Sequence, residues 1–124
     1  MVEVNYTYNA FVTNVLDGDT IDCDIDTGFH ITVKYRLRLA RIDTPELNSS
    51  DPMQRQAASN AKAFVVSEVL SRPVMIQTRK ADGFGRYLSE IYYTRPNIGD
   101  IPWAFCNLSD ELLKAGYAKL YVRG

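Results

Sequence analysis

The run Thr20-Ile21-Asp22-Cys23-Asp24-Ile25-Asp26 alternates apolar and polar residues without a break. Side chains of a β-strand point alternately to its two faces, so this spacing is typical of a half-buried strand. Thr27-Gly28 then supplies a turn, and the run Phe29–Leu39 alternates again. Its apolar residues stand at the odd positions: Phe29, Ile31, Val33, Tyr35, Leu37 and Leu39. We therefore predict a β-hairpin formed by Thr20–Asp26 and Phe29–Leu39.

One further strand and a helix are predicted next to this hairpin. Phe11–Leu16 is rich in β-branched residues and leads directly into Asp17-Gly18-Asp19, so it is expected to be the strand before the hairpin and to complete a three-stranded meander. Pro52 suits the first turn of a helix. The apolar residues that follow it recur at intervals of three and four, as in an amphipathic helix: Met53, Ala57, Ala61, Phe64, Val65 and Val69.

The C-terminal half predicts a second hairpin. Val74–Arg79 and Tyr87–Tyr93 both have strand character, and the Asp82-Gly83 pair between them is a strong turn signal. Thr94–Phe105 contains two prolines and a glycine, and we expect it to be an irregular connection.

The chain is expected to end in a short helix. Asn107 can cap this helix and Gly116 can stop it, and Lys119–Val122 can add a short closing segment. The order strand, strand, strand, helix, strand, strand, helix predicts a mainly β protein with helices, of the α+β class. We expect a five-stranded OB-type barrel with a helix between strands 3 and 4 and a short C-terminal helix.

Composition indicates an ordinary globular protein. The 124 residues fit a single domain spanning residues 1–124, and the formal net charge of −1 gives no overall attraction for polyanions. Two cysteines are too few for a disulfide framework, so Cys23 and Cys106 are expected to be buried thiols. No apolar run is long enough to span a membrane, and the stretch 1–6 lacks the pattern of a leader, so we expect a cytoplasmic protein; the alternative is a secreted protein whose leader was removed. No obligate protein partner is expected.

Two acidic clusters flank the arginine-rich strand. Asp17-Gly18-Asp19-Thr20 precedes it and Asp43-Thr44-Pro45-Glu46 follows it. Carboxylates that converge repel one another unless a cation lies between them, and Ca²⁺ takes carboxylate, carbonyl and water oxygens. Asp19, Asp43 and the Thr44 carbonyl are therefore candidate metal ligands. The alternative for each cluster is a chain-reversing turn without a ligand.

Arg38 and Arg86 are the candidate anion-binding residues. Arg38 lies on the strand face opposite Leu37 and Leu39, so its guanidinium is expected to emerge near Asp43. A guanidinium presents a planar fork of donors that suits two phosphate oxygens. The alternative for either arginine is a solvated charge or a salt bridge. His30 is the only histidine, and we expect it to be a solvated surface residue.

In their order and spacing, four segments resemble the staphylococcal nuclease (thermonuclease) family. They are Val15–Thr20, Arg36–Glu46, Asp82–Arg86 and Leu112–Lys119. The resemblance implies an OB-type barrel that uses Ca²⁺ to hydrolyse phosphodiester bonds of DNA and RNA, leaving 3′-phosphate ends.

The resemblance also implies a role for each matching residue. Asp19 and Asp43 match the metal-binding aspartates, and Thr44 matches the residue that offers its carbonyl to the metal. Arg38 and Arg86 match the phosphate-binding arginines. Glu46 matches the catalytic glutamate, which accepts a proton from water or orients the water.

The chain departs from the family pattern where the substrate is expected to bind. Gly83 and Phe84 stand in place of a lysine and a tyrosine, and Phe84 can still stack on a base. Tyr121 alone stands where the family's type member has two tyrosines. Phe84 and Tyr121 are therefore the predicted substrate contacts.

Two other functions compete with a nuclease. A catalytically silent OB module would bind nucleic acid or a protein, but it has no need for the combined acidic and arginine set. A Ca²⁺-stabilised structural domain would explain the aspartates, but it leaves Arg38, Arg86 and Glu46 without a role.

Overall fold

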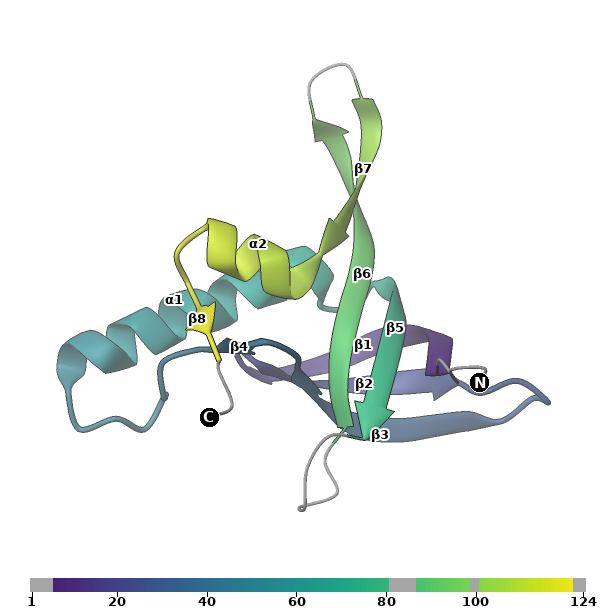
Figure 1. The fold of residues 1–124 in the computed structure, drawn as a ribbon, viewed down its shortest axis with the longest axis horizontal. Helices are drawn as coiled ribbons and strands as arrows, with labels where there is room; N and C mark the ends of the chain where they lie inside the picture. The colour runs from purple at the N-terminus through teal and green to yellow at the C-terminus, as the bar shows by residue number, and fades with distance from the viewer. Residues whose placement is uncertain (1–5, 81–86, 99–100, 122–124) are drawn as a thin grey trace, which may run out of the picture.

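The structure, a computed structural model, describes residues 6–80, 87–98 and 101–121. Three strands, β1 (Tyr6–Asp17), β2 (Thr20–Asp26) and β3 (Thr32–Leu39), form an antiparallel meander. The two-residue strand β4 (Ile42–Asp43) leads toward helix α1 (Pro52–Val69). Figure 1 shows α1 lying beside the sheet.

The second half of the chain adds the remaining elements. Strands β5 (Pro73–Lys80), β6 (Tyr87–Ile98) and β7 (Ile101–Asn107) form antiparallel pairs in sequence. Helix α2 (Leu108–Lys114) and strand β8 (Lys119–Leu120) follow, and β8 pairs with β4. The predicted hairpin of β5 and β6 is confirmed, although its Asp82-Gly83 turn lies outside the described residues.

The sheet closes into a barrel. Its strand order is β3-β2-β1-β5-β6-β7, and a parallel pairing between β3 and β6 joins its two ends. This closure uses the register Arg38↔Leu88 and Leu39↔Ser89. Five strands therefore form the closed barrel: β1, β2, β3, β5 and β6. Along the chain, α1 comes between the third and fourth of these strands, β3 and β5. The predicted OB-type α+β fold is confirmed.

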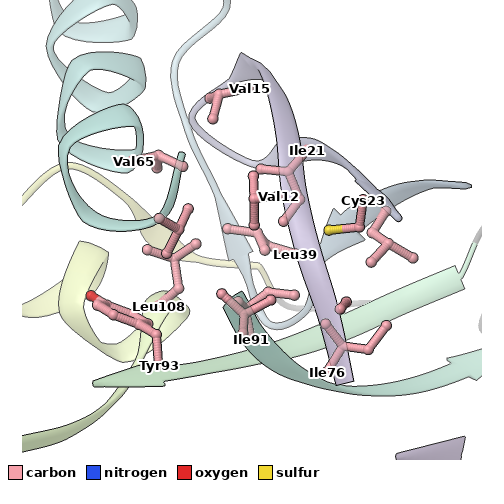
Figure 2. Close-up of a cluster of buried hydrophobic side chains, with 14 of the residues drawn as sticks. Val12, Val15, Ile21, Cys23, Leu39, Val65, Ile76, Ile91, Tyr93 and Leu108 are labelled. Carbon is pink, nitrogen blue, oxygen red and sulfur yellow. The ribbon is translucent and has the colours of Figure 1, made fainter. Parts of the chain in front are cut away.

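The barrel interior is filled by the apolar faces that the alternation predicts. Ile21, Cys23 and Ile25 point inward from β2, and Leu37 and Leu39 point inward from β3. Val65 of α1 and Leu108 of α2 meet strand residues in the same cluster (Figure 2). Both cysteines are buried thiols, as expected.

The start of the second hairpin strand was predicted too early. Phe29 and His30 have positive φ, and Thr27 and Ile31 are hydrogen-bonded across the turn, so β3 begins at Thr32. Phe29 is 94% exposed, because it lies at the tip of the hairpin. Val33 and Tyr35 are only partly covered and line an apolar hollow of about 400 Å³.

Two other expectations need correction. The described part of the segment Thr94–Phe105 is not irregular: β6 continues to Ile98 and pairs with β7, and these strands project from the barrel (Figure 1). Met53 does not join the buried face of α1, since it is 81% exposed in the first helical turn. The buried helix residues are Ala58, Ala61, Val65 and Val69.

Both helices begin at caps. Asp51 accepts a hydrogen bond from the Met53 amide at 3.0 Å, and Asn107 accepts one from the Asp110 amide at 3.1 Å. The predicted Asn107 cap is thereby confirmed, and Gly116, with φ +81°, ends α2 as expected. Within the described residues, neither helix combines the length and apolarity needed to cross a membrane.

Candidate active site

A polar cleft of about 450 Å³ lies where the end of β3 meets β4 and the residue after β8. The barrel closure brings the β1–β2 turn, the corner after β3 and the ends of β5 and β6 to this place. Seven charged residues line the cleft: Asp17, Asp19, Arg38, Arg41, Asp43, Glu46 and Arg79. Among the described residues, four carboxylates thus face three guanidinium groups.

Arg38 joins the two acidic clusters. Its Nη1 lies 2.9 Å from Oδ2 of Asp19, and its Nη2 lies 3.0 Å from Oδ1 of Asp43. The guanidinium leaves the barrel wall beside Asp43, as its position in β3 predicts. One planar guanidinium therefore contacts a carboxylate from each acidic cluster, and its positive charge lies between Asp19 and Asp43.

Asp17 and Asp19 form an unequal pair at the β1–β2 turn. Burial, together with the contact to Asp19, raises the pKa of Asp17 to about 6. Burial also opposes ionisation of Asp19, but three contacts outweigh it: the hydrogen bond with Asp17, the charge of Arg38 and the Thr44 amide. The pKa of Asp19 is therefore lowered, so Asp19 ionises first and Asp17 gains its charge only as the pH rises through about 6.

Thr44 and Glu46 follow Asp43 in the chain, and Glu46 lies on the wall of the cleft. The buried Thr44 donates its amide N–H to Oδ2 of Asp19 at 3.2 Å, which fixes the second cluster against the first. Glu46 is exposed and lines the cleft beside Asp43. The structure thus brings Asp19, Arg38, Asp43, Thr44 and Glu46 together.

The C-terminal strand completes one rim of the cleft. β8 pairs with β4, and the Tyr121 amide then donates to the carbonyl of Arg41 at 2.9 Å. The Tyr121 side chain is 53% exposed and lines the cleft, where the sequence predicts a substrate contact. The two other predicted site residues, Phe84 and Arg86, lie outside the described residues.

Sequence reasoning missed Arg79 and the individual importance of Asp17. The alternation in Val74–Arg79 does place Arg79 on the outer face of its strand, because Val74, Ile76 and Thr78 are buried. Arg79 lines the cleft because β6 pairs with both β5 and β3, which places the outer face of β5 next to that of β3. No local sequence signal indicates this double pairing. Two other arginines form ion pairs: Arg36 with Asp22, and Arg41 with Glu90 and Asp110.

The donor atoms in this cleft suit a hard cation. No histidine or cysteine is among the described lining residues, and the metal-binding atoms available are carboxylate, hydroxyl and carbonyl oxygens. This composition fits Ca²⁺ better than Zn²⁺, which prefers nitrogen and sulfur ligands. Residues 6–80, 87–98 and 101–121 contain no group of three or more His, Cys, Asp or Glu residues placed to hold a metal. A bound Ca²⁺ would therefore need the Thr44 carbonyl and water in addition to Asp19 and Asp43.

A five-stranded barrel with an acidic, arginine-lined cleft at its wall defines a class of OB-fold proteins, and comparison with known sequences narrows that class. Residues 36–124 match the family model described as "Staphylococcal nuclease homologue". This match covers more than half of the chain, so the chain belongs to the staphylococcal nuclease family.

Several curated proteins are similar to the chain. An uncharacterized protein of Methanocaldococcus jannaschii, MJ1439, is 27% identical over 98% of this chain and 63% of its own length. "Endonuclease Htp3" of Saprolegnia parasitica is 29% identical over 93% of this chain and 56% of its own length. "Probable endonuclease lcl3" of Emericella nidulans is 32% identical over 68% of this chain and 30% of its own length. The chain thus spans between about one third and two thirds of the length of these relatives.

Proposed function

We propose that the protein is a Ca²⁺-dependent nuclease that hydrolyses phosphodiester bonds of DNA and RNA and leaves 3′-phosphate ends. Family membership and the relatives named endonuclease support nucleic-acid hydrolysis. The observation that carries the proposal is the contact of Arg38 with both Asp19 and Asp43 in one open cleft. This arrangement gathers the proposed metal ligands and a guanidinium fork for a phosphate in one cleft.

The charges of the cleft favour a metal ion. Four carboxylates face three guanidinium groups in the cleft. One of these groups, that of Arg41, is already paired with Glu90 and Asp110, which do not line the cleft. A polyanion would be repelled unless a further cation entered. Asp19, Asp43 and the Thr44 carbonyl would hold Ca²⁺. Such an ion neutralises phosphate charge and lowers the pKa of a coordinated water.

The remaining chemistry falls to residues of the chain. Glu46 is exposed on the cleft wall and would accept a proton from the attacking water or orient that water. Arg38 would turn its donors toward the equatorial phosphate oxygens, where negative charge grows in the transition state. Arg86 is proposed for the same task through the family resemblance. Tyr121, and Phe84 by that resemblance, would contact the bases.

The central experiment measures cleavage of single-stranded DNA and of RNA with Ca²⁺, with a chelator, and in the Glu46→Gln variant. We expect cleavage only with the metal, a strong loss in Glu46→Gln, and products that a polymerase cannot extend because they lack a 3′-hydroxyl. Cleavage that survives the chelator would refute the metal mechanism. Absence of cleavage under every condition would overturn the nuclease proposal and favour a binding module.

Arg38→Ala and Arg36→Ala form a matched pair for the phosphate role. Both arginines lie on β3 and both contact carboxylates, but Arg36 pairs with Asp22 away from the cleft. We expect Arg38→Ala to lower kcat by about 10²-fold or more, whereas Arg36→Ala retains activity. Equal rates in the two variants would remove Arg38 from the site.

A further inference from the structure

Arg79 stands in the same row of residues as Arg38. In the barrel register, Arg38 of β3 is the partner of Leu88 of β6, and Leu88 is the partner of Arg79 of β5. Paired residues of neighbouring strands share a face of the sheet, so both arginines lie on the cleft side. Two strand spacings separate their backbones, on the order of 10 Å.

The three described arginines of the cleft differ in their partners. Arg38 contacts Asp19 and Asp43, and Arg41 contacts Glu90 and Asp110. Arg79 is exposed, and it forms no hydrogen bond or ion pair with another described residue. Its charge acts on Glu90 only as a weaker influence, after the hydrogen bonds from Arg41 and Asn107. No described residue therefore occupies the donors of Arg79, which lies on the wall of an otherwise acidic cleft.

We propose that Arg79 forms a second phosphate-binding subsite, which holds a backbone phosphate next to the one that is cleaved. This inference rests on the proposed nuclease function. A phosphate is the ligand whose charge and geometry match a guanidinium fork exposed on the wall of this cleft. Because the row separates Arg79 from Arg38, the two arginines contact different phosphates of one strand. Arg79 is thus a positioning residue that acts on substrate binding.

The first test compares Arg79→Gln with Arg72→Gln, an exposed arginine that does not line the cleft. Binding of a single-stranded oligonucleotide is measured at several salt concentrations, with Ca²⁺ and in the Glu46→Gln background. We expect Arg79→Gln to weaken binding about tenfold and to reduce the slope of log affinity against log salt by about 0.7, the value for one phosphate contact on a single strand. Arg72→Gln should leave both unchanged, and Arg79→Lys should restore the slope. Equal affinities and slopes in Arg79→Gln and Arg72→Gln would overturn the inference.

The second test locates the phosphate. Oligonucleotides that carry one neutral methylphosphonate linkage, moved along the strand, are bound to the parent and to Arg79→Gln. We expect one position at which neutralisation weakens binding to the parent but not to Arg79→Gln. A pattern that is identical in both proteins would refute the subsite.

Steady-state kinetics separate this inference from the proposed function. In the active protein, Arg79→Gln should raise KM about tenfold and change kcat by less than about twofold. A fall in kcat without a change in KM would contradict the binding role. An inactive parent protein would refute the nuclease proposal, while the binding measurements would still decide the role of Arg79.

Discussion

Gly18 sets the distance between the acidic turn and the helix beside it. A Cβ atom at this position would lie 2.8 Å from Cβ of Ala61 and 2.9 Å from Cγ2 of Thr44. Both atoms belong to short side chains fixed to the backbone, so neither can move aside without moving its element. The absence of a side chain at Gly18 therefore lets Asp17 and Asp19 approach the second acidic cluster.

Gly18→Ala is expected to damage both stability and activity. Overpacking against α1 and Thr44 should lower the free energy of unfolding by about 1–3 kcal/mol, measured by urea denaturation, and the displaced aspartates should lower cleavage. Gly28→Ala is the control, since its Cβ meets no atom within 4 Å but its φ is +84°. That variant should lose about 1 kcal/mol and keep its activity. Wild-type activity in Gly18→Ala would show that the turn tolerates displacement.

The sequence predicts residues of the site best where they are close along the chain. Arg38 and Asp43 are separated by a single corner, and alternation alone places Arg38 on the outer face beside it. Asp19 reaches Arg38 because β2, which follows Asp19, pairs with β3, and the hairpin pattern also predicts this pairing. Arg79 depends on the closure of the barrel through two residue pairs, and no local pattern encodes such a long-range contact.

At the scale of the elements, an ion-pair network connects the corner between β3 and β4 to strand β6 and to helix α2. Arg41 adopts a positive φ of +70°, which costs energy for a residue with a side chain. Its guanidinium contacts Glu90 of β6 at 2.5 Å and Asp110 of α2 at 2.9 Å. Asn107, which caps α2, also donates to Glu90 at 2.9 Å. This network ties β6 and α2 to the corner from which Asp43 and Thr44 extend.

Glu90→Gln tests this network through its pH dependence. Burial disfavours the charged carboxylate, but hydrogen bonds from Arg41 and Asn107 outweigh that cost, so the pKa of Glu90 is lowered. A carboxylate with a lowered pKa stabilises the folded state above its unfolded pKa of about 4.3 and loses that contribution as the pH falls through its folded pKa.

We expect Glu90→Gln to lower the free energy of unfolding by about 2 kcal/mol at pH 7. The difference from wild type should shrink once the pH falls well below 4, as urea denaturation at both pH values will show. Asp24→Asn, which removes an exposed pair with Lys34, should cost less than about 1 kcal/mol. A Glu90→Gln effect that is independent of pH would contradict the electrostatic explanation.

The sequence predicts β6 and β7 least well near their prolines. Pro96 and Pro102 favour an irregular segment, yet both stand in the paired strands β6 and β7. The pairing of β5 with β6 reaches only Met75↔Tyr92, so no strand among the described residues pairs with that side of β6 near Pro96. β7 is at the edge of the sheet, where prolines are tolerated because one row of amides needs no partner.

At the scale of the whole molecule, the barrel is closed by few contacts. β3 and β6 share two residue pairs, and the Ala40 amide adds a hydrogen bond of 3.0 Å to the Ser89 carbonyl. Ala40 is also bound through its carbonyl oxygen, which accepts a hydrogen bond of 2.9 Å from the hydroxyl of Ser109 in α2. Ala40 therefore joins the two ends of the sheet to the C-terminal helix, directly behind the cleft that Arg41 and Asp43 line.

The two serines around Ala40 offer a matched test of this closure. Both are fully buried, but within the part of the chain that the structure describes, the Ser89 hydroxyl has no hydrogen-bond partner. Removal of an unsatisfied buried hydroxyl relieves a desolvation cost, so Ser89→Ala should keep or raise the free energy of unfolding by up to about 1 kcal/mol. Ser109→Ala removes a bond and leaves the Ala40 carbonyl with a lost donor, so it should cost about 1–3 kcal/mol. Urea denaturation of both variants measures the contrast. Equal losses of unfolding free energy in the two variants would show that the Ser89 hydroxyl is hydrogen-bonded in solution and that barrel closure does not depend on Ser109. The expected difference would assign the closing contact to the Ser109–Ala40 hydrogen bond.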